Sequence, residues 1–206
     1  MVKSQAVHRA GSSAIRDLLE LTEQPGIVSL AGGLPHPATF PTEAIGAALE
    51  SVRHDGAALQ YGPTEGYRPL RDWVVRTTDA SGGLSADNVQ ITGGAQQALD
   101  LTLRALVDPG GVVAVGEATY VGALQSMRAA GIEVAPIPTD GDGLQVEALA
   151  EWLRVGPPVA AVYVVSNFDN PTGSTLSEDR RRALAALADR YGFWIIDDDP
   201  YGALRW

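Results

Sequence analysis

The sequence lacks cysteine, and its most apolar stretch, Val159–Val165, is much shorter than the roughly 20 residues that a membrane-spanning helix needs. A disulfide scaffold and a thiolate metal site are therefore excluded, and a reducing compartment is permitted. The first 17 residues contain no apolar segment of the kind that a secretory signal requires. From these absences we expect a cytoplasmic protein that does not span a membrane.

Positive charge is also scarce. The sequence has 15 Lys and Arg residues against 25 Asp and Glu residues, which gives a formal net charge of −10. No stripe of basic and aromatic residues interrupts this balance, so we expect neither nucleic acid nor an anionic membrane as a partner. His8, His36 and His54 are scattered without ligand spacing, and no metal site is expected.

What the sequence does contain is the composition of a globular domain, with 45% apolar and 19% charged residues. The first forty residues differ from the rest, with a helical face at Ile15–Thr22, a short strand at Ile27–Leu30 and a Gly/Pro-rich loop. Pro41 then opens a helix, and the turn-rich Tyr61–Gly66 leads into another.

From Val89 onward, apolar strands alternate with amphipathic helices. The expected strands are Val89–Thr92, Val112–Val115, Glu133–Ile137, Val159–Val165 and Trp194–Ile196, and the expected helices lie near 96–106, 121–130, 145–154 and 178–191. Strands that are apolar on both faces and alternate with helices predict an α/β fold of three layers, with a mainly parallel sheet between helices. Trp73, Trp152 and Trp194 fall in these patterns and are expected in the core.

Polar, turn-forming residues follow four of the five strands, at Gly93–Gln96, Glu117–Tyr120, Asn167–Gly173 and Asp197–Tyr201. The carboxyl ends of parallel strands meet at one edge of a sheet, where such folds bind ligands. Each segment also has a purely structural interpretation: a tight turn for the first, and a loop before a helix capped by Thr175 or Ser177 for the third.

Two of these segments carry specific chemistry. Glycines at the start of the helix near residue 96 suit a phosphate, because free N–H groups at a helix N-terminus attract anions. Asp197, Asp198 and Asp199 repel one another at the end of a buried strand, so at least one needs a cationic or hydrogen-bonding partner. A protonated pyridine nitrogen is such a partner, and solvation in a turn explains two of the three.

Six segments in order, SLAGGLPHPATFP, QYGPTEGYRPLR, ITGGAQQALDL, EATY, NFDNPTG and IIDDDPY, resemble the class I/II aminotransferases of pyridoxal-phosphate (PLP) fold type I. The branch that handles 2-aminoadipate, aromatic and branched-chain amino acids is the most similar. The resemblance covers essentially the whole chain. It implies residues 1–40 as an N-terminal arm and small-domain segment, and residues 41–206 as part of a PLP-binding large domain.

The resemblance also implies roles for individual residues. Asp198 corresponds to the partner of the pyridine nitrogen, Tyr120 to the residue stacked on the ring, and Asn170 and Tyr201 to the partners of the phenolic oxygen. The remaining assignments are the phosphate contacts Gly94, Ala95 and Gln96, the substrate contacts Gly33 and Asn170, and Tyr61, which would reach the phosphate of a second subunit in a homodimer. Ala95 departs from the family, which often has Ser there.

The resemblance further implies a Schiff-base lysine beyond the Asp198–Tyr201 segment, whereas Lys3 is the single lysine of this sequence. No catalytic residue is therefore assigned, and we expect a chain that lacks the last strands of its sheet and the C-terminal small domain. The expected activity is amino transfer between an amino acid and a 2-oxo acid. Alternatives are a non-catalytic PLP-binding fragment, a β-lyase or decarboxylase on the same fold, and the effector domain of a transcriptional regulator.

Overall fold

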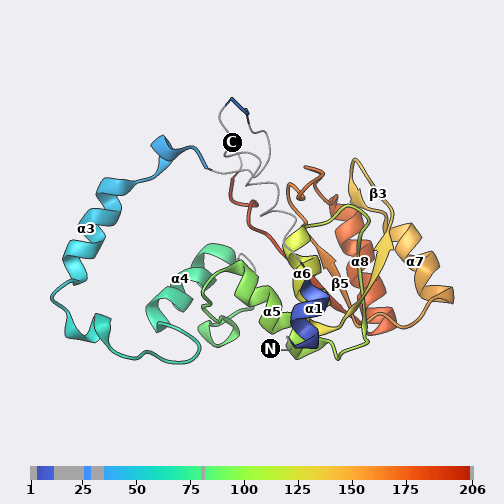
Figure 1. Ribbon diagram of the computed structural model, residues 1–206, viewed down its shortest axis with the longest axis horizontal. Coiled ribbons are helices and arrows are strands. Elements are labelled where there is room, and N and C mark those ends of the chain that lie inside the picture. Colours follow the sequence, from blue (N-terminus) through green and yellow to red (C-terminus); the bar gives the residue numbers. More distant parts are fainter. Residues whose placement is uncertain (1–3, 12–25, 29–34, 80–81, 205–206) are drawn as a thin grey trace. The chain divides into compact units, whose positions relative to one another are not determined.

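The computed structural model describes residues 4–11, 26–28, 35–79 and 82–204 (Figure 1). The chain divides into two compact units: the larger holds residues 94–206 together with the first 17, and the smaller holds residues 18–93. The predicted helical face at Ile15–Thr22 and the loop residue Gly33 lie outside the described residues. Ile27 and Val28 are described and are not in a strand.

A parallel sheet forms the centre of the larger unit. Its order is β2 (Glu133–Ile137), β1 (Val112–Gly116), β5 (Ala161–Val164) and β6 (Trp194–Asp197), and all three neighbouring pairs are parallel. Four of the five predicted strands are thus confirmed, as is the parallel pairing. The connections are long enough to hold helices, which parallel neighbours require.

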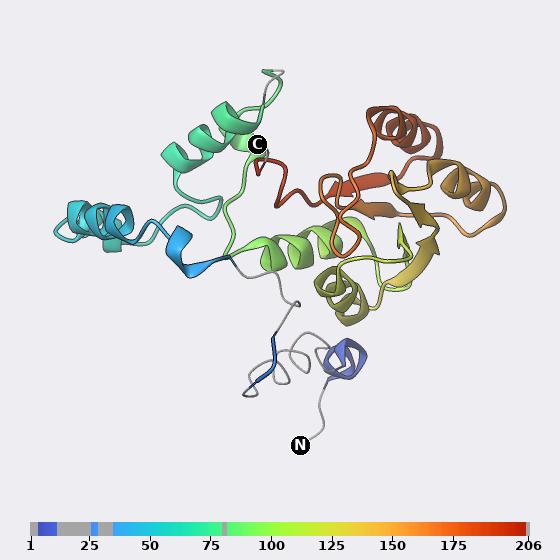
Figure 2. The same cartoon turned by 90° about the horizontal axis from the view of Figure 1, so that it is seen from above.

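Helices cover both faces of this sheet, because successive residues of a strand point to opposite sides. Val113, Val115, Ala161 and Tyr163 pack with helices α5 (Ala95–Leu106) and α6 (Val121–Ala130). Their strand neighbours Val112, Ala114, Val162 and Val164 pack with α7 (Val146–Val155) and α8 (Glu178–Tyr191). Figure 2 shows the strands between these two pairs of helices, which confirms the predicted three layers.

Two smaller elements complete the larger unit. A short antiparallel hairpin joins β3 (Thr139–Asp140) to β4 (Gly143–Leu144), and Gly143 turns the chain with a φ of 89° that favours glycine. Arg180 of α8 donates to both carboxylate oxygens of Asp140 and so ties the hairpin to that helix. Near the N-terminus, α1 (Gln5–Ala10) packs against α6.

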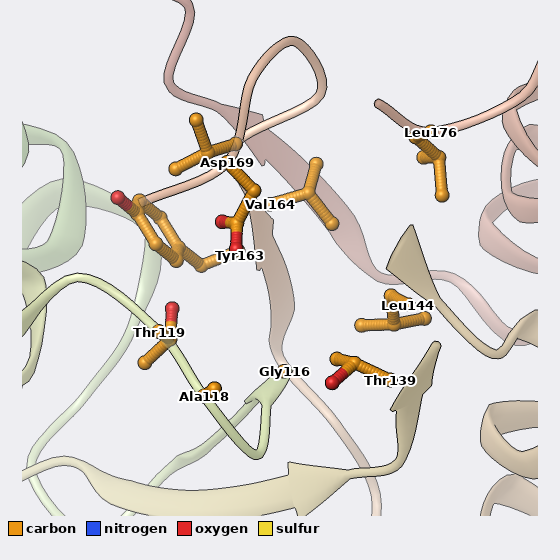
Figure 3. A pocket seen from close by; sticks show the side chains of 10 residues that line it. Gly116, Ala118, Thr119, Thr139, Leu144, Tyr163, Val164, Asp169 and Leu176 are labelled. Carbon is orange, nitrogen blue, oxygen red and sulfur yellow. The ribbon is translucent and has the colours of Figure 1, made fainter. Parts of the chain in front are cut away.

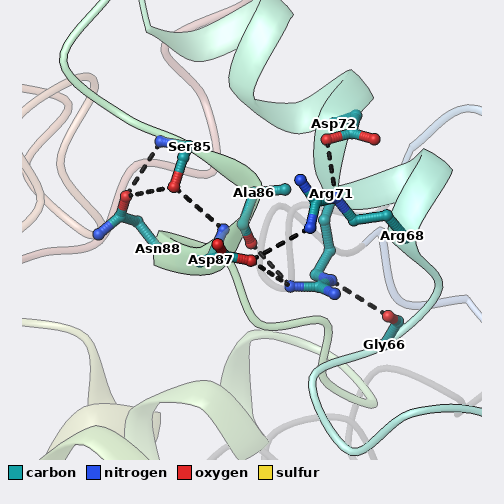
Figure 4. Close-up of polar contacts among 8 residues, drawn as sticks. All are labelled: Gly66, Arg68, Arg71, Asp72, Ser85, Ala86, Asp87 and Asn88. Carbon is teal, nitrogen blue, oxygen red and sulfur yellow. Dashed lines mark hydrogen bonds and ion pairs between the residues drawn. The ribbon is translucent and has the colours of Figure 1, made fainter.

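The smaller unit contains helices and no strand among the residues that the structure describes. Its elements are η1 (Pro37–Thr39), α3 (Thr42–Val52), η2 (Gly56–Leu59), α4 (Arg68–Thr78) and η3 (Ala86–Asn88). Arg71 of α4 is buried, and it donates to the backbone oxygens of Gly66 and Ala86 at 3.1 and 2.8 Å (Figure 4). One guanidinium therefore joins the turn before α4 to the segment after it.

Two further predictions made from the sequence are wrong. Val89–Thr92 forms no strand, although Ile91 donates a backbone hydrogen bond to Glu65 at 2.9 Å. A strand needs a continuous ladder to a neighbour, and the apolar pattern does not supply one. Trp73 and Trp194 are 55% and 60% exposed rather than in the core, while Trp152 packs against the core as expected. Trp194 lies on β6, which is the edge strand of the described sheet.

Candidate functional site

Three polar segments leave the sheet at the same edge. They follow the carboxyl ends of β1, β5 and β6, which are adjacent parallel strands. This arrangement confirms the convergence that the sequence predicts for the residues after Gly116, Val165 and Ile196. The fourth predicted segment, Gly93–Gln96, follows no strand, but Gly94 is the N-cap of α5.

The three consecutive aspartates at the end of β6 have three different environments. Asp197 accepts hydrogen bonds from the backbone N–H of Ser166 at 3.2 Å and from its hydroxyl at 2.8 Å, one on each carboxylate oxygen. Asp199 accepts the N–H of Gly202 at 2.8 Å. Asp198 accepts the hydroxyl of Tyr163 on Oδ2 at 2.8 Å, and none of the described residues donates to its Oδ1. Of the three aspartates, only Asp198 is half-buried, and its Oδ1 accepts no hydrogen bond from a described residue.

Tyr163 lies beneath this edge in the middle of β5, with no exposed surface. Burial raises the pKa of its phenol well above the usual range, and the negative charge of Asp198 adds to the shift. Asp169 and Tyr120 contribute smaller electrostatic effects in the same direction, so both lie near the phenol. The hydroxyl therefore keeps its proton and donates to Asp198.

Helices α5 and α6 present their N-termini beside one another. The side-chain amide of Gln96 donates to the backbone oxygen of Gly122 at 3.0 Å and to the hydroxyl of Ser126 at 2.7 Å. A methyl group on Gly122 would lie 2.5 Å from the ring of Tyr120, so glycine allows that ring to lie close against the start of α6. The side-chain amide nitrogen of Gln96 is thus engaged by two acceptors of α6.

The Asn-Pro-Thr-Gly loop is held by its own polar atoms and by α8. The Asp169 backbone oxygen accepts the N–H of Gly173 at 2.6 Å, and its carboxylate accepts the hydroxyl of Thr172 at 2.7 Å. Arg181 donates to the backbone oxygens of Leu176 and Ser166 at 2.8 and 2.7 Å. Asn170 is exposed within this braced loop, after which Ser177 caps α8 as one of the two predicted caps.

A hollow opens at this edge between the end of β1, the β3–β4 hairpin and the loop after β5 (Figure 3). Its lining includes the polar residues Thr119 and Asp169, the ring of Tyr163, and the apolar residues Leu144 and Leu176. Sequence reasoning did not single out Tyr163 or Asp169. A signal for Tyr163 was present, because it is a hydroxyl-bearing residue within the aliphatic run Ala161–Val165.

The predicted site residues fall into three groups. Tyr120 and Tyr201 pack against the core cluster of the larger unit that contains Tyr163, and Asp198 bonds to Tyr163 there. Tyr61 belongs to the smaller unit and is fully exposed. Gly33 lies outside the described residues.

The described residues include neither a cluster of metal ligands nor a membrane-spanning helix. These residues contain no group of three or more His, Cys, Asp or Glu side chains placed to hold a metal ion. No helix in the described part of the chain has the length and apolar character needed to cross a membrane.

Comparison with known proteins identifies similar sequences and structures. The family model for aminotransferases of class I and II matches residues 27–206. Aromatic-amino-acid aminotransferase 1 of Thermococcus litoralis is 42% identical over 95% of this chain and 49% of its own length. The 2-aminoadipate transaminase of Thermus thermophilus is 40% identical, also over 95% of this chain and 49% of its own length. Among solved structures, Pyrococcus horikoshii kynurenine aminotransferase is 43% identical with a TM-score of 0.90, covering 99% of this chain and 52% of that one. The chain thus spans about half the length of these relatives.

Proposed function

This chain belongs to the class I and II aminotransferase family, and from that premise we propose that its protein transfers an amino group between an amino acid and a 2-oxo acid with PLP as cofactor. The observation that carries the proposal is the environment of Asp198. Its carboxylate is half-buried at the ligand-binding edge of a parallel sheet, with Oδ2 held by Tyr163 and Oδ1 accepting no bond from a described residue.

The residues at this edge fit PLP. A half-buried carboxylate suits a protonated ring nitrogen, because an opposite charge favours the ionised form of both groups. The N-terminus of α5 suits the phosphate, since the N–H groups and the dipole at the start of a helix favour an anion. Two relatives with solved structures are described with such molecules, PMP in the Pyrococcus horikoshii enzyme and N-(5'-phosphopyridoxyl)-L-leucine in the Thermus thermophilus α-aminoadipate aminotransferase.

We assign Asp198 to the pyridine nitrogen, where its negative charge keeps the ring protonated. Bound PLP supplies an electron sink for the bonds of the substrate Cα. Tyr120, whose ring lies against Gly122, stacks on the ring face. Asn170 and Tyr201 donate to the phenolic oxygen, and Asn170 also lies near the substrate.

The phosphate assignment is refined by the contacts of Gln96. Because the side chain of Gln96 donates to Gly122 and Ser126, we assign the phosphate to the backbone N–H groups of Gly94, Ala95 and Gln96. The absence of a hydroxyl at Ala95 removes one side-chain donor from this set.

The assignments outside the larger unit concern a second subunit and the substrate. Tyr61 is fully exposed, as expected of a side chain that reaches the phosphate in a partner subunit, and we propose a homodimer on that basis. Gly33 is proposed to lie near the substrate carboxylate. The aromatic, 2-aminoadipate and kynurenine specificities in the relatives' names define the first amino donors to screen. The lack of cysteine accords with a cytoplasmic location.

The test separates cofactor binding from turnover, because amino transfer also needs a Schiff-base amine, a role that is assigned to no residue of this chain. PLP is titrated into the protein, purified as its gene encodes it, and binding is followed by absorbance. We expect saturable binding that Asp198→Asn weakens about tenfold or more, since the charge-assisted contact is lost. Asp199→Asn is the control, because its carboxylate bonds to Gly202.

Transamination is then measured with the amino donors named above and 2-oxoglutarate. Formation of the corresponding 2-oxo acid is the expected result. Absence of PLP binding would overturn the proposal, and binding without turnover of any donor would favour a non-catalytic PLP-binding protein. Elimination or decarboxylation products would instead indicate the alternative chemistries of the same fold. Light scattering gives the oligomeric state, and a monomer would contradict the role of Tyr61.

A further inference from the structure

We propose, on the basis of the function proposed above, that Tyr163 is a positioning residue for the cofactor. Its hydroxyl holds Oδ2 of Asp198 so that Oδ1 faces the pyridine nitrogen. Tyr163 itself touches neither substrate nor cofactor in this assignment.

The contact joins two adjacent strands at their carboxyl ends. Tyr163 pairs with Ile196 in the register of β5 and β6, and Asp198 is two residues further along the chain, directly after the end of β6. The N–H of Asp198 donates to the backbone oxygen of Val164 at 2.9 Å. This bond holds the main chain of Asp198 next to that of β5, where Tyr163 donates to the carboxylate at 2.8 Å. Both partners of the bond are thus held by sheet hydrogen bonds.

Burial makes this bond obligatory. Tyr163 has no exposed surface, so its hydroxyl depends on the carboxylate of Asp198 as its hydrogen-bond acceptor. Leaving a buried hydroxyl without an acceptor is unfavourable, so the hydroxyl restrains the rotation of the carboxylate. The nearby Asp169 and Tyr120 also raise the pKa of the Tyr163 phenol, so the hydroxyl keeps its proton. In this hydrogen bond the hydroxyl of Tyr163 is therefore always the donor and Oδ2 of Asp198 the acceptor.

A neighbouring contact shows what distinguishes this pair. The hydroxyl of Ser166 donates to Asp197 at 2.8 Å, the same distance as in the Tyr163–Asp198 bond. Asp197 accepts a second bond on its other oxygen, from the N–H of Ser166, so both of its oxygens are used within the protein. Asp198 has one oxygen held and the other available. A structural role explains the Ser166–Asp197 pair, whereas orientation toward a cation explains the Tyr163–Asp198 pair.

The experiment compares two cofactors in three proteins. PLP and its 1-deaza analogue, in which carbon replaces the ring nitrogen, are titrated into the wild-type protein, Tyr163→Phe and Ser166→Ala, each as the gene encodes it. We expect wild type to prefer PLP over the analogue. Tyr163→Phe keeps the ring and its packing, and we expect it to bind PLP about fivefold more weakly while its affinity for the analogue is unchanged.

Ser166→Ala is the matched control, because it removes a hydroxyl–carboxylate bond of equal length from the neighbouring aspartate. We expect it to lower thermal stability without changing the ratio of the two affinities. An equal loss of both affinities in Tyr163→Phe, or an unchanged ratio, would overturn the positioning role. Failure of wild type itself to discriminate between PLP and the analogue would instead overturn the role of Asp198, so the two proposals fail separately. Circular dichroism and thermal melting confirm that each variant is folded.

Discussion

The two units of this chain use amphipathic helices in different ways. In the larger unit, the apolar stripe of α5 is covered by the sheet, and Leu99 and Leu103 are buried. In the smaller unit, α3 has the same kind of stripe, but Ile45, Leu49 and Val52 are 44–63% exposed and no residue of the helix is buried. The comparison teaches that periodicity identifies a helix and its apolar face, whereas burial depends on whether another element lies opposite that face.

The organisation of the smaller unit accordingly depends more on polar contacts. The buried residue of α4 is Arg71, and its hydrogen bonds to Gly66 and Ala86 join three segments of the unit. In the larger unit, clusters of apolar side chains on the two faces of the sheet hold the elements together instead. Substitutions in each unit test this difference.

The largest expected effect on stability distinguishes a buried leucine in α5 from an exposed leucine in α3. Leu103→Ala in α5 removes a side chain with no exposed surface, and we expect a loss of about 3 kcal/mol in the free energy of unfolding from lost burial and a residual cavity. Leu49→Ala in α3 removes a side chain that is 63% exposed, with an expected change within about 0.5 kcal/mol. Urea denaturation followed by circular dichroism measures both. Equal losses would show that the face of α3 is covered in solution and would break the comparison.

A smaller effect is expected from the buried cation of the smaller unit. Arg71→Met removes the donors to Gly66 and Ala86 while keeping most of the side-chain volume, and we expect about 2 kcal/mol of lost local stability. Hydrogen exchange at the amide of Ile91, which donates to Glu65, reports on this unit directly.

Arg68→Met is the control, because Arg68 is exposed and its ion pairs with Asp72 and Asp87 lie at the surface. Exchange at Ile91 should change little in that variant. If both substitutions accelerate exchange equally, burial of Arg71 does not organise the unit.

The smallest effect concerns a surface contact of the larger unit and its dependence on pH. The hydrogen bonds from Arg180 hold the pKa of Asp140 at about 2, below its ordinary 3.8. A carboxyl group whose pKa is lower in the folded state stabilises the protein above its unfolded pKa, and this contribution is lost as pH falls through the folded value. We therefore expect the difference in stability between wild type and Asp140→Asn to be present above pH 3.8 and to vanish by about pH 2.

Thermal melting across this range, at low and high salt, measures that difference. The contact is partly solvated, so salt should reduce it. A difference that persists below pH 2 would show that Asp140 stabilises the hairpin through its packing rather than through its charge.

Much of the larger unit could be predicted from residues alone. The helix predicted near 178–191 is α8 at those bounds, because Ser177 caps its start and Gly192 ends it in the left-handed region. The strands predicted at Val112–Val115 and Glu133–Ile137 are β1 and β2, since their runs are apolar on both faces. Val89–Thr92 alternates apolar and polar residues, as a strand with one buried face does, and forms no strand, because pairing depends on a neighbouring strand.

The candidate site could be predicted in part. The sequence indicated that at least one of the three aspartates has a cationic or hydrogen-bonding partner, and the family resemblance assigned the pyridine nitrogen to Asp198. Its assignment, like those of the other site residues, stays a prediction, as does the division of the chain at residue 40. Tyr163 could not be assigned a role, because a tyrosine in an apolar strand is typical of a core residue and its hydrogen bond joins residues 35 positions apart.

The sequence by itself determined the parallel α/β architecture of the larger unit, because periodicity, caps and turn residues act over a few neighbouring positions. It also determined the family, since six ordered segments carry that information. Only the tertiary structure decided which aspartate oxygen is available, which helix face is covered and which tyrosine restrains Asp198. Each of these depends on groups that are distant along the chain and are brought within hydrogen-bond or van der Waals contact by the packing of β5 against β6 and of helices against the sheet.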